Sequence, residues 1–167
     1  MKITPCDHKS VEELQQAPFL IHNTVIINCS ADRLFTILED AHAWTVWASS
    51  LTLVEWTSPK PFGIGTTRDV TMTGGILGRE EFIAWETNQR MAFCFTESSM
   101  PNMSAFGEDY HIKTLNDNQI QLDWFVAMWP AGINKVFMPL FKPMMKWFLG
   151  GFLKKLKQMA EGDYQPH

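Results

Sequence analysis

Ionisable side chains in strand-like segments are the residues of this sequence that could carry out acid–base chemistry. In residues 105–115, Glu108 and Tyr110 fall on one side, because alternate residues of a strand point to the same face of a sheet. If that face is turned inwards, it brings a carboxylate and a hydroxyl into the interior. A buried carboxylate has a raised pKa or needs a partner, for which Arg68 and Arg79 are the candidates. The alternative is that Glu108 is an ordinary charge on a solvated strand.

Metal ligands and activated nucleophiles are not indicated. The sequence has five histidines, which are His8, His22, His42, His111 and His167. None stands at a spacing typical of a metal site, and no Cys-x-x-Cys pair or Gly-x-Ser-x-Gly elbow is present. Gly74 and Gly75 lie between two strand-like segments, where they predict a hairpin turn and not a phosphate-binding loop. We therefore expect no metal and no cofactor.

The composition is that of a globular protein with an unusual apolar content. The chain has 167 residues, enough for one domain with a sizeable core, and contains 12 Phe, 10 Met and 7 Trp but only 2 Tyr. The formal net charge is −4, and no basic cluster argues for nucleic acid. Aromatic rings and thioethers can fill a dense core, and they also suit the wall of an adaptable apolar pocket.

The cysteines and the N-terminal residues favour a reducing cytosol. The three cysteines, Cys6, Cys29 and Cys94, are odd in number and widely spaced, which argues against a disulfide framework. Cys29 and Cys94 lie in apolar strand-like runs, so we expect them to be buried. The N-terminal residues lack the apolar stretch of a signal peptide.

Turn residues divide the chain into one strand, two short helices, six further strands and a final helical region. The predicted strands are Phe19–Cys29, Leu51–Thr57, Thr66–Thr73, Arg79–Glu86, Met91–Glu97, Ala105–Leu115 and Gln119–Trp129. The predicted helices between the first two strands are Ala31–Glu39, with Ser30 as N-cap, and Asp40–Trp47. Short connections between strands favour antiparallel hairpins, so the order indicates an α+β protein. Residues 1–18 form a polar arm with a short helix over Val11–Gln16.

The helical region, residues 133–161, is interrupted by Pro139 and Pro143. Proline removes a helix hydrogen bond and crowds the preceding turn, so we expect a break there and a straighter helix from about Pro143. Side chains at helical spacing predict one inward face, made of Phe141, Met145, Phe148, Phe152, Leu156 and Met159.

The other side of Val136–Leu149 is also apolar. It carries Phe137, Leu140, Met144 and Trp147, with Lys135, Lys142 and Lys146 alongside. The three lysines argue against a transmembrane helix, which needs about 20 residues almost free of charge. Apolar and basic residues in this arrangement are typical of a surface that contacts a membrane, so peripheral membrane contact is one hypothesis and a protein contact is another.

Four segments of the chain, in this order and spacing, resemble a known family. They are the strand-to-helix run from Val25 to Asp40, the pair Trp44 and Trp47, the stretch from Gly63 to Arg68, and Glu80–Glu86 leading to Arg90-Met91-Ala92-Phe93. The family is the polyketide cyclase/dehydrase-like (SRPBCC) branch of the START/Bet v 1-like superfamily. The resemblance covers residues 19–161 and leaves residues 1–18 as an N-terminal arm and 162–167 as a C-terminal tail. The arm and the proline-interrupted last helix depart from the family pattern.

This resemblance implies a helix-grip fold, in which a curved antiparallel sheet of about seven strands wraps around a long C-terminal helix. In such a fold the sheet and helix are held apart around a cavity. We expect the cavity to be lined by Trp44, Trp47, Phe93, Phe95, Tyr110, Trp124, Phe141, Met145, Phe148 and Phe152. The alternative is a fully packed core without a void.

Three functional hypotheses follow. The first is the binding, transport or sequestration of a small hydrophobic molecule such as a lipid, an isoprenoid or a polyketide-like compound. The second is a cyclase or dehydratase in the same pocket, with Tyr110, Arg68 and Glu108 as the candidate catalytic residues. The third is a membrane-surface or protein-interaction module that uses the exposed side of the last helical region. For the assembly we expect a monomer or a homodimer.

Overall fold

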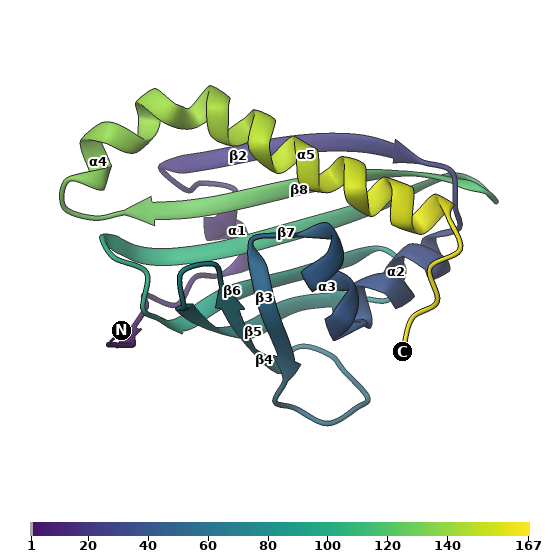
Figure 1. The fold of residues 1–167 in the computed structure, drawn as a ribbon, viewed down its shortest axis with the longest axis horizontal. Helices are drawn as coiled ribbons and strands as arrows, with labels where there is room; N and C mark the ends of the chain where they lie inside the picture. The colour runs from purple at the N-terminus through teal and green to yellow at the C-terminus, as the bar shows by residue number, and fades with distance from the viewer. Residues whose placement is uncertain (1) are drawn as a thin grey trace.

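A curved antiparallel sheet wraps around the C-terminal helix α5 (Lys142–Glu161) in the computed structural model, which describes residues 2–167. The strands are β1 (Thr4–Pro5), β2 (Phe19–Ile27), β3 (Leu51–Trp56), β4 (Thr67–Met72), β5 (Ile76–Glu86), β6 (Arg90–Ser98), β7 (Met103–Asn116) and β8 (Gln119–Pro130). Their order in the sheet is β2-β8-β7-β6-β5-β4-β3, and β1 pairs with β6 outside this path. Figure 1 shows α5 crossing one side of the sheet. The predicted α+β fold is confirmed.

Alternation of apolar and polar residues gives the sheet its two faces. In β8, Ile120, Leu122, Trp124 and Val126 are buried on the side of the helix. Asp123 points to the opposite face, where its carboxylate accepts a hydrogen bond from Thr24 at 2.5 Å. The concave face of the sheet is therefore the apolar one, and it is the face that α5 covers.

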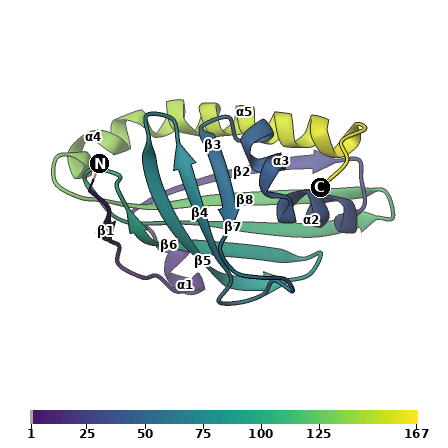
Figure 2. The same ribbon diagram turned by 60° about the horizontal axis from the view of Figure 1, so that its bottom comes forward.

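Two short helices, α2 (Ala31–Glu39) and α3 (Ala41–Trp47), follow β2 and begin at side-chain caps. The Ser30 hydroxyl accepts a hydrogen bond from the Arg33 amide at 3.2 Å, and the Asp40 carboxylate accepts one from the His42 amide at 2.9 Å. Such caps satisfy amides that have no partner within a helix. Figure 2 shows both helices at the end of the sheet where the C terminus also lies.

The last helical region breaks at its prolines, as predicted. It consists of α4 (Asn134–Phe137), a 3-10 turn η1 (Met138–Phe141) and α5, which has Pro143 in its first turn. The second half of α5 packs into the sheet with Phe152, Leu153, Leu156, Met159 and Ala160 buried.

The predicted inward face is wrong at Phe141, which lies in η1 and is 49% exposed. Phe148 of α5 is 52% exposed, but it also lines the cavity under the helix, as predicted. A 3-10 turn has about 3.0 residues per turn and not 3.6, so the helical phase changes before α5 begins.

The N-terminal arm packs against the convex face of the sheet. The helix α1 (Val11–Leu14) inserts the fully buried Leu14 among Ala84, Ala92 and Ala127. A methyl group at Gly107 would lie 2.6 Å from Leu14 Cδ2, so only glycine leaves room for this side chain. The sequence did not predict β1, which pairs Thr4 and Pro5 with the end of β6.

Candidate functional site

A cavity of about 170 Å³ lies between the concave face of the sheet, α3 and α5. All the predicted cavity residues line it except Phe141; these are Trp44, Trp47, Phe93, Phe95, Tyr110, Trp124, Met145, Phe148 and Phe152. Phe141 lies in η1, where its side chain is exposed to solvent. The three candidate catalytic residues, Arg68, Glu108 and Tyr110, also line the cavity.

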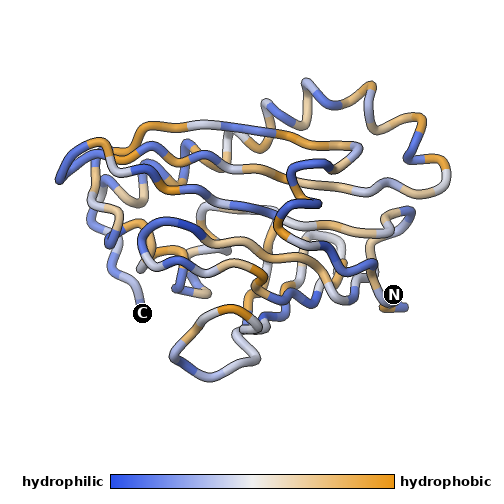
Figure 3. The backbone as a smooth tube through the Cα atoms, turned by 180° about the vertical axis from the view of Figure 1, so that it is seen from behind, coloured by the Kyte–Doolittle hydropathy of each residue, from blue (hydrophilic) through white to orange (hydrophobic). Residues whose placement is uncertain are grey.

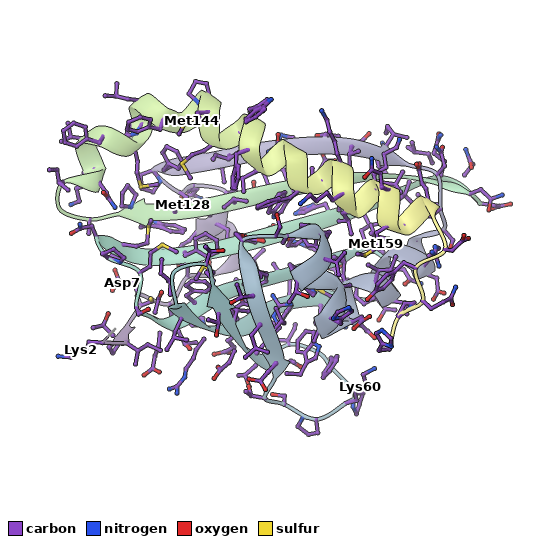
Figure 4. All side chains as sticks on the ribbon, viewed as in Figure 1. Lys2, Asp7, Lys60, Met128, Met144 and Met159 are labelled. Atoms are coloured by element: carbon purple, nitrogen blue, oxygen red, sulfur yellow. The ribbon has the colours of Figure 1, made fainter. Side chains whose placement is uncertain are left out.

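Methionines contribute a flexible part of the wall. Met72, Met100, Met128 and Met145 come from β4, the β6–β7 loop, β8 and α5, respectively. Figure 4 labels Met128 on β8, beneath the helical region. Unbranched thioether side chains change shape at low cost, so the wall can adapt to ligands of different outline.

A buried ion pair joins Arg68 of β4 to Glu80 of β5 at the wall of this cavity. Arg68 Nε donates a hydrogen bond to Glu80 Oε2 at 2.6 Å, and Nη2 lies 2.5 Å from the same oxygen. The register of the β4–β5 hairpin places the two residues directly opposite each other. Burial raises the pKa of the Glu80 carboxyl, and the charge of the Arg68 guanidinium opposes that rise.

Aromatic rings surround the Arg68 guanidinium. Its Cζ lies 4.1 Å from the centroid of the Trp44 ring and 5.1 Å from that of Phe93. Cation–π attraction of this kind stabilises a charge that has left water. Within residues 2–167, however, Arg68 Nη1 has no hydrogen-bond acceptor, and neither has the buried Nε1 of Trp47. Both residues belong to the lining of the cavity, which makes them the candidates for contact with a polar group of a ligand.

A second polar group in the cavity is formed by Glu108, Tyr110 and Trp124. Tyr110 Oη donates a hydrogen bond to Glu108 Oε2, and Trp124 Nε1 donates to the same oxygen at 3.0 Å. Burial raises the pKa of Glu108 to about 7, although the hydrogen bond from Tyr110 lowers it. Burial also raises the pKa of the Tyr110 hydroxyl well above its usual value, which keeps it a proton donor. Glu108 can therefore exchange a proton near neutral pH.

Arg79, a candidate partner for a buried carboxylate, and Asp109 both lie outside the cavity. Arg79 points away from the cavity, with its side chain 54% exposed, and donates to Glu97 at 2.5 Å. Asp109 faces the convex side, where Arg90 donates two hydrogen bonds to its carboxylate. Burial raises the pKa of Asp109, but the hydrogen bonds from His111 and Arg90 outweigh burial and lower it. This cluster is outside the cavity.

Glu80 is the charged residue of the cavity lining that sequence reasoning did not select. A signal for it exists in the hairpin, because the turn at Gly74-Gly75 joins Met72 to Ile76. Counting back from that turn places Arg68 opposite Glu80, so a buried arginine on one strand requires a carboxylate at that position on the other.

Other kinds of site are not found in residues 2–167. No group of His, Cys, Asp and Glu side chains there is arranged to hold a metal ion. None of the helices in that range combines the length and the hydropathy needed to span a bilayer.

Comparisons with known proteins bear on both the family and the fold. The family described as polyketide cyclase/dehydrase and lipid transport matches residues 18–161. An uncharacterised protein of Mycobacterium tuberculosis is 40% identical over 160 residues, which cover 96% of this chain and 95% of that protein.

Two solved structures share the fold at low sequence identity. A START superfamily protein from Mycobacterium smegmatis has a TM-score of 0.69 at 16% identity, over 85% of this chain and 97% of that one. An aromatase/cyclase from a Streptomyces species has a TM-score of 0.62 at 13% identity, over 84% of this chain and 94% of that one.

Proposed function

The chain belongs to the polyketide cyclase/dehydrase and lipid transport family, and from this premise we propose that it binds a small hydrophobic molecule with a hydrogen-bond-accepting oxygen. The observation that carries the proposal is a predominantly apolar cavity lined by two residues, Arg68 and Trp47, that each hold a buried N–H without an acceptor in residues 2–167. A buried donor without a partner costs about 1–3 kcal/mol, so an acceptor from a ligand stabilises the complex. Binding of this kind would serve transport or sequestration.

The size of the cavity sets the ligand that fits without rearrangement. At about 170 Å³ it is similar to cavities that hold one benzene-sized ring. Pockets that bind drug-sized ligands have volumes of roughly 300–1,000 Å³. A lipid or a polyketide-like molecule therefore requires the methionine side chains and the start of α5 to move, whereas a single aromatic ketone does not.

Native mass spectrometry of the purified protein tests the proposal. We expect a stoichiometric mass increment, and denaturing extraction should release a hydrophobic molecule that contains oxygen. If the protein has only its apo mass, acetophenone serves as the probe because it combines one ring with one carbonyl. Failure of acetophenone to bind in ligand-observed NMR, together with an apo mass, would count against the proposal.

Arginine variants separate the role of the cavity from a general effect of charge. Arg68→Met/Glu80→Leu removes the cavity donor without leaving an unpaired buried carboxylate, and it should weaken acetophenone binding by about tenfold, the order expected when a hydrogen bond to a charged donor is lost. Arg79→Met is the matched control, because Arg79 is an exposed arginine on the adjacent strand and lies outside the cavity. Equal weakening by both variants would show that the cavity donor plays no part.

A second candidate function is a cyclase or dehydratase reaction, and the Glu108–Tyr110 pair favours it. A general base works best when its pKa lies near the working pH, and the pKa of Glu108 is about 7. We propose that Glu108 removes a proton from a carbon next to a ketone, while an N–H donor on the cavity wall stabilises the enolate oxygen.

Hydrogen–deuterium exchange at the central carbon of benzoylacetone, followed by NMR in D2O, tests this reaction. Wild type should accelerate the exchange, and Glu108→Gln should abolish the acceleration while retaining binding of the diketone. Exchange at the same rate in the variant would remove Glu108 from the chemistry and leave the binding function in place.

A further inference from the structure

The segment 133–148, which we call the docking segment, exposes most of its apolar side chains. It comprises α4, η1 and the first turns of α5. The exposed side chains include Val136, Phe137, Leu140, Phe141, Met144 and Trp147, of which Leu140 and Trp147 are 73% and 78% exposed, respectively. Elsewhere in residues 2–167, the exposed large apolar residues are Ile26, Val46, Leu53, Ile64, Leu77 and Leu115, and all of these except Ile64 are less than 50% exposed. A contiguous exposed apolar patch marks an interaction surface.

The charge of this region is opposite to that of the whole chain. The chain has a net charge of −4, yet no Asp or Glu occurs from residue 124 to residue 160. The docking segment contributes Lys135, Lys142 and Lys146, all exposed. In residues 2–167, the lysines in ion pairs are Lys9, with Glu13, and Lys157, with Glu161, so the three lysines of the docking segment have no carboxylate partner.

The outer side of the segment faces solvent, whereas its inner side contacts β2, where Asn23 Nδ2 donates a hydrogen bond to the Lys146 carbonyl at 3.3 Å. Figure 1 shows α4 and the beginning of α5 at the end of the molecule opposite the C terminus, along its outer edge. Figure 3 shows hydrophobic and hydrophilic residues interspersed along this part of the backbone. Lysines beside exposed Trp and Leu residues are the arrangement by which a helix lies in the interface of an anionic bilayer.

Charge argues against a second copy of the chain as the occupant. A twofold interface brings the same patch of two subunits together. Here it would place the lysines of both copies in one apolar interface without any carboxylate from either segment, and like charges in an interface are unfavourable. An anionic surface, in contrast, supplies the missing negative charge.

We propose that the docking segment binds the surface of an anionic lipid bilayer and faces the cavity towards it. Met145 and Phe148 connect the two sites, because both line the cavity and Phe148 is also 52% exposed. A hydrophobic molecule can then pass between the bilayer and the cavity along this side of α5. This last step rests on the proposed ligand-binding function, whereas the docking itself does not.

Co-sedimentation with lipid vesicles tests the docking. The protein should bind vesicles of phosphatidylcholine and phosphatidylglycerol in equal parts, bind pure phosphatidylcholine at least tenfold more weakly, and lose affinity as salt screens the lysines. Leu140→Ser should weaken binding to the anionic vesicles by about tenfold, as expected for one large apolar side chain. Lys142→Ser should weaken it by about fivefold at low salt.

Two variants outside the docking segment control for the loss of an exposed apolar side chain and for the loss of a lysine. Ile64→Ser alters a residue that is 74% exposed on a different loop and should leave vesicle binding unchanged. Lys113→Ser is the corresponding control for charge, because Lys113 is exposed on β7. Absence of binding to the anionic vesicles, or equal losses in Leu140→Ser and Ile64→Ser, would overturn the proposal.

Two further measurements separate the possible occupants and the two functions. A dimeric mass in sedimentation equilibrium that Leu140→Ser converts to a monomeric mass would assign the surface to a second copy and overturn the membrane assignment. Native mass spectrometry of Trp147→Ser should show the same bound molecule as wild type, because Trp147 is 78% exposed and does not line the cavity. Vesicle binding by protein freed of ligand then reports docking alone.

Discussion

Arg68 and Glu80 face each other across the β4–β5 hairpin, and both side chains are closed off from solvent, with 0% and 4% exposed, respectively. The guanidinium satisfies Glu80 through Nε but leaves Nη1 without an acceptor. The pair therefore fixes a positive charge on the wall of an apolar cavity and keeps part of its hydrogen-bonding capacity unused. Such a pair contributes little net stability, because desolvation offsets its Coulomb attraction.

Breaking the pair from one side should destabilise the protein strongly. Glu80→Ala leaves a buried arginine without a counter-charge and should lower the free energy of unfolding by about 3–5 kcal/mol. Urea unfolding at pH 7 measures this change. The double variant Arg68→Met/Glu80→Leu should recover most of the loss, because neither charge remains. A double variant as unstable as Glu80→Ala would show that packing, and not the uncompensated charge, causes the effect.

Glu108 should make the stability of the protein fall between about pH 4.5 and pH 7. Its pKa in the folded protein is about 7, against 4.5 for the free side chain, so the folded state binds more protons than the unfolded state in this range. The stabilisation from the protonated Glu108 is fully present below pH 4.5, the pKa of the free side chain, and it is lost as the pH rises through about 7, the pKa in the folded protein. The loss due to Glu108 is about 3 kcal/mol.

The variant Glu108→Gln isolates this contribution, since other carboxyl groups titrate in the same range. We measure the free energy of unfolding of both proteins in urea from pH 4 to pH 8. The variant should become increasingly more stable than wild type as the pH rises. A difference that does not depend on pH would mean that the Glu108 carboxyl titrates normally and is unsuited to proton transfer at neutral pH.

Leu14→Ala should release the N-terminal arm from the sheet. Leu14 is fully buried against Gly107 and against Ala84, Ala92 and Ala127 on the convex face. Its truncation therefore leaves a cavity that these small side chains cannot fill. We expect a loss of about 2–3 kcal/mol in the free energy of unfolding and faster proteolysis within residues 1–18. Val11→Ala, at a partly exposed position of the same helix, should change both far less. Unchanged proteolysis in Leu14→Ala would mean that β1 alone holds the arm.

Local signals were sufficient to predict most of the fold. The helix α2 has the predicted bounds Ala31–Glu39, because a serine cap precedes an amphipathic run and a capping aspartate follows it. The strands of the main sheet follow from alternation and from turn residues between them. β1 could not be predicted, since Thr4–Pro5 is a strand only through its pairing with Ser98 and Glu97, far along the chain.

The cavity residues were predictable to the extent that regular periodicity places them. Tyr110 and Trp124 lie on strands with unbroken alternation, and their rings stack in the cavity wall with centroids 5.7 Å apart. Phe141 was misplaced because the 3-10 turn before α5 changes the helical phase. Arg79 was selected together with Arg68 because the sequence alone does not give the register of β4 against β5. That register pairs Arg68 with Glu80 and Asp69 with Arg79.

Val126→Phe should fill the cavity and abolish ligand binding without unfolding the protein. Val126 is buried on β8 and lines the cavity, so a larger ring at this position enters space of about 170 Å³ that the protein does not occupy. Overpacking a tight core costs about 1–3 kcal/mol, whereas filling a void costs less and can stabilise. We expect a free energy of unfolding within about 1 kcal/mol of wild type and no detectable acetophenone binding by NMR. Val46→Phe makes the same substitution at an exposed position of α3 and should retain binding. A strongly destabilised Val126→Phe would show that the core is already packed, and retained binding in a stable variant would place the ligand outside this cavity.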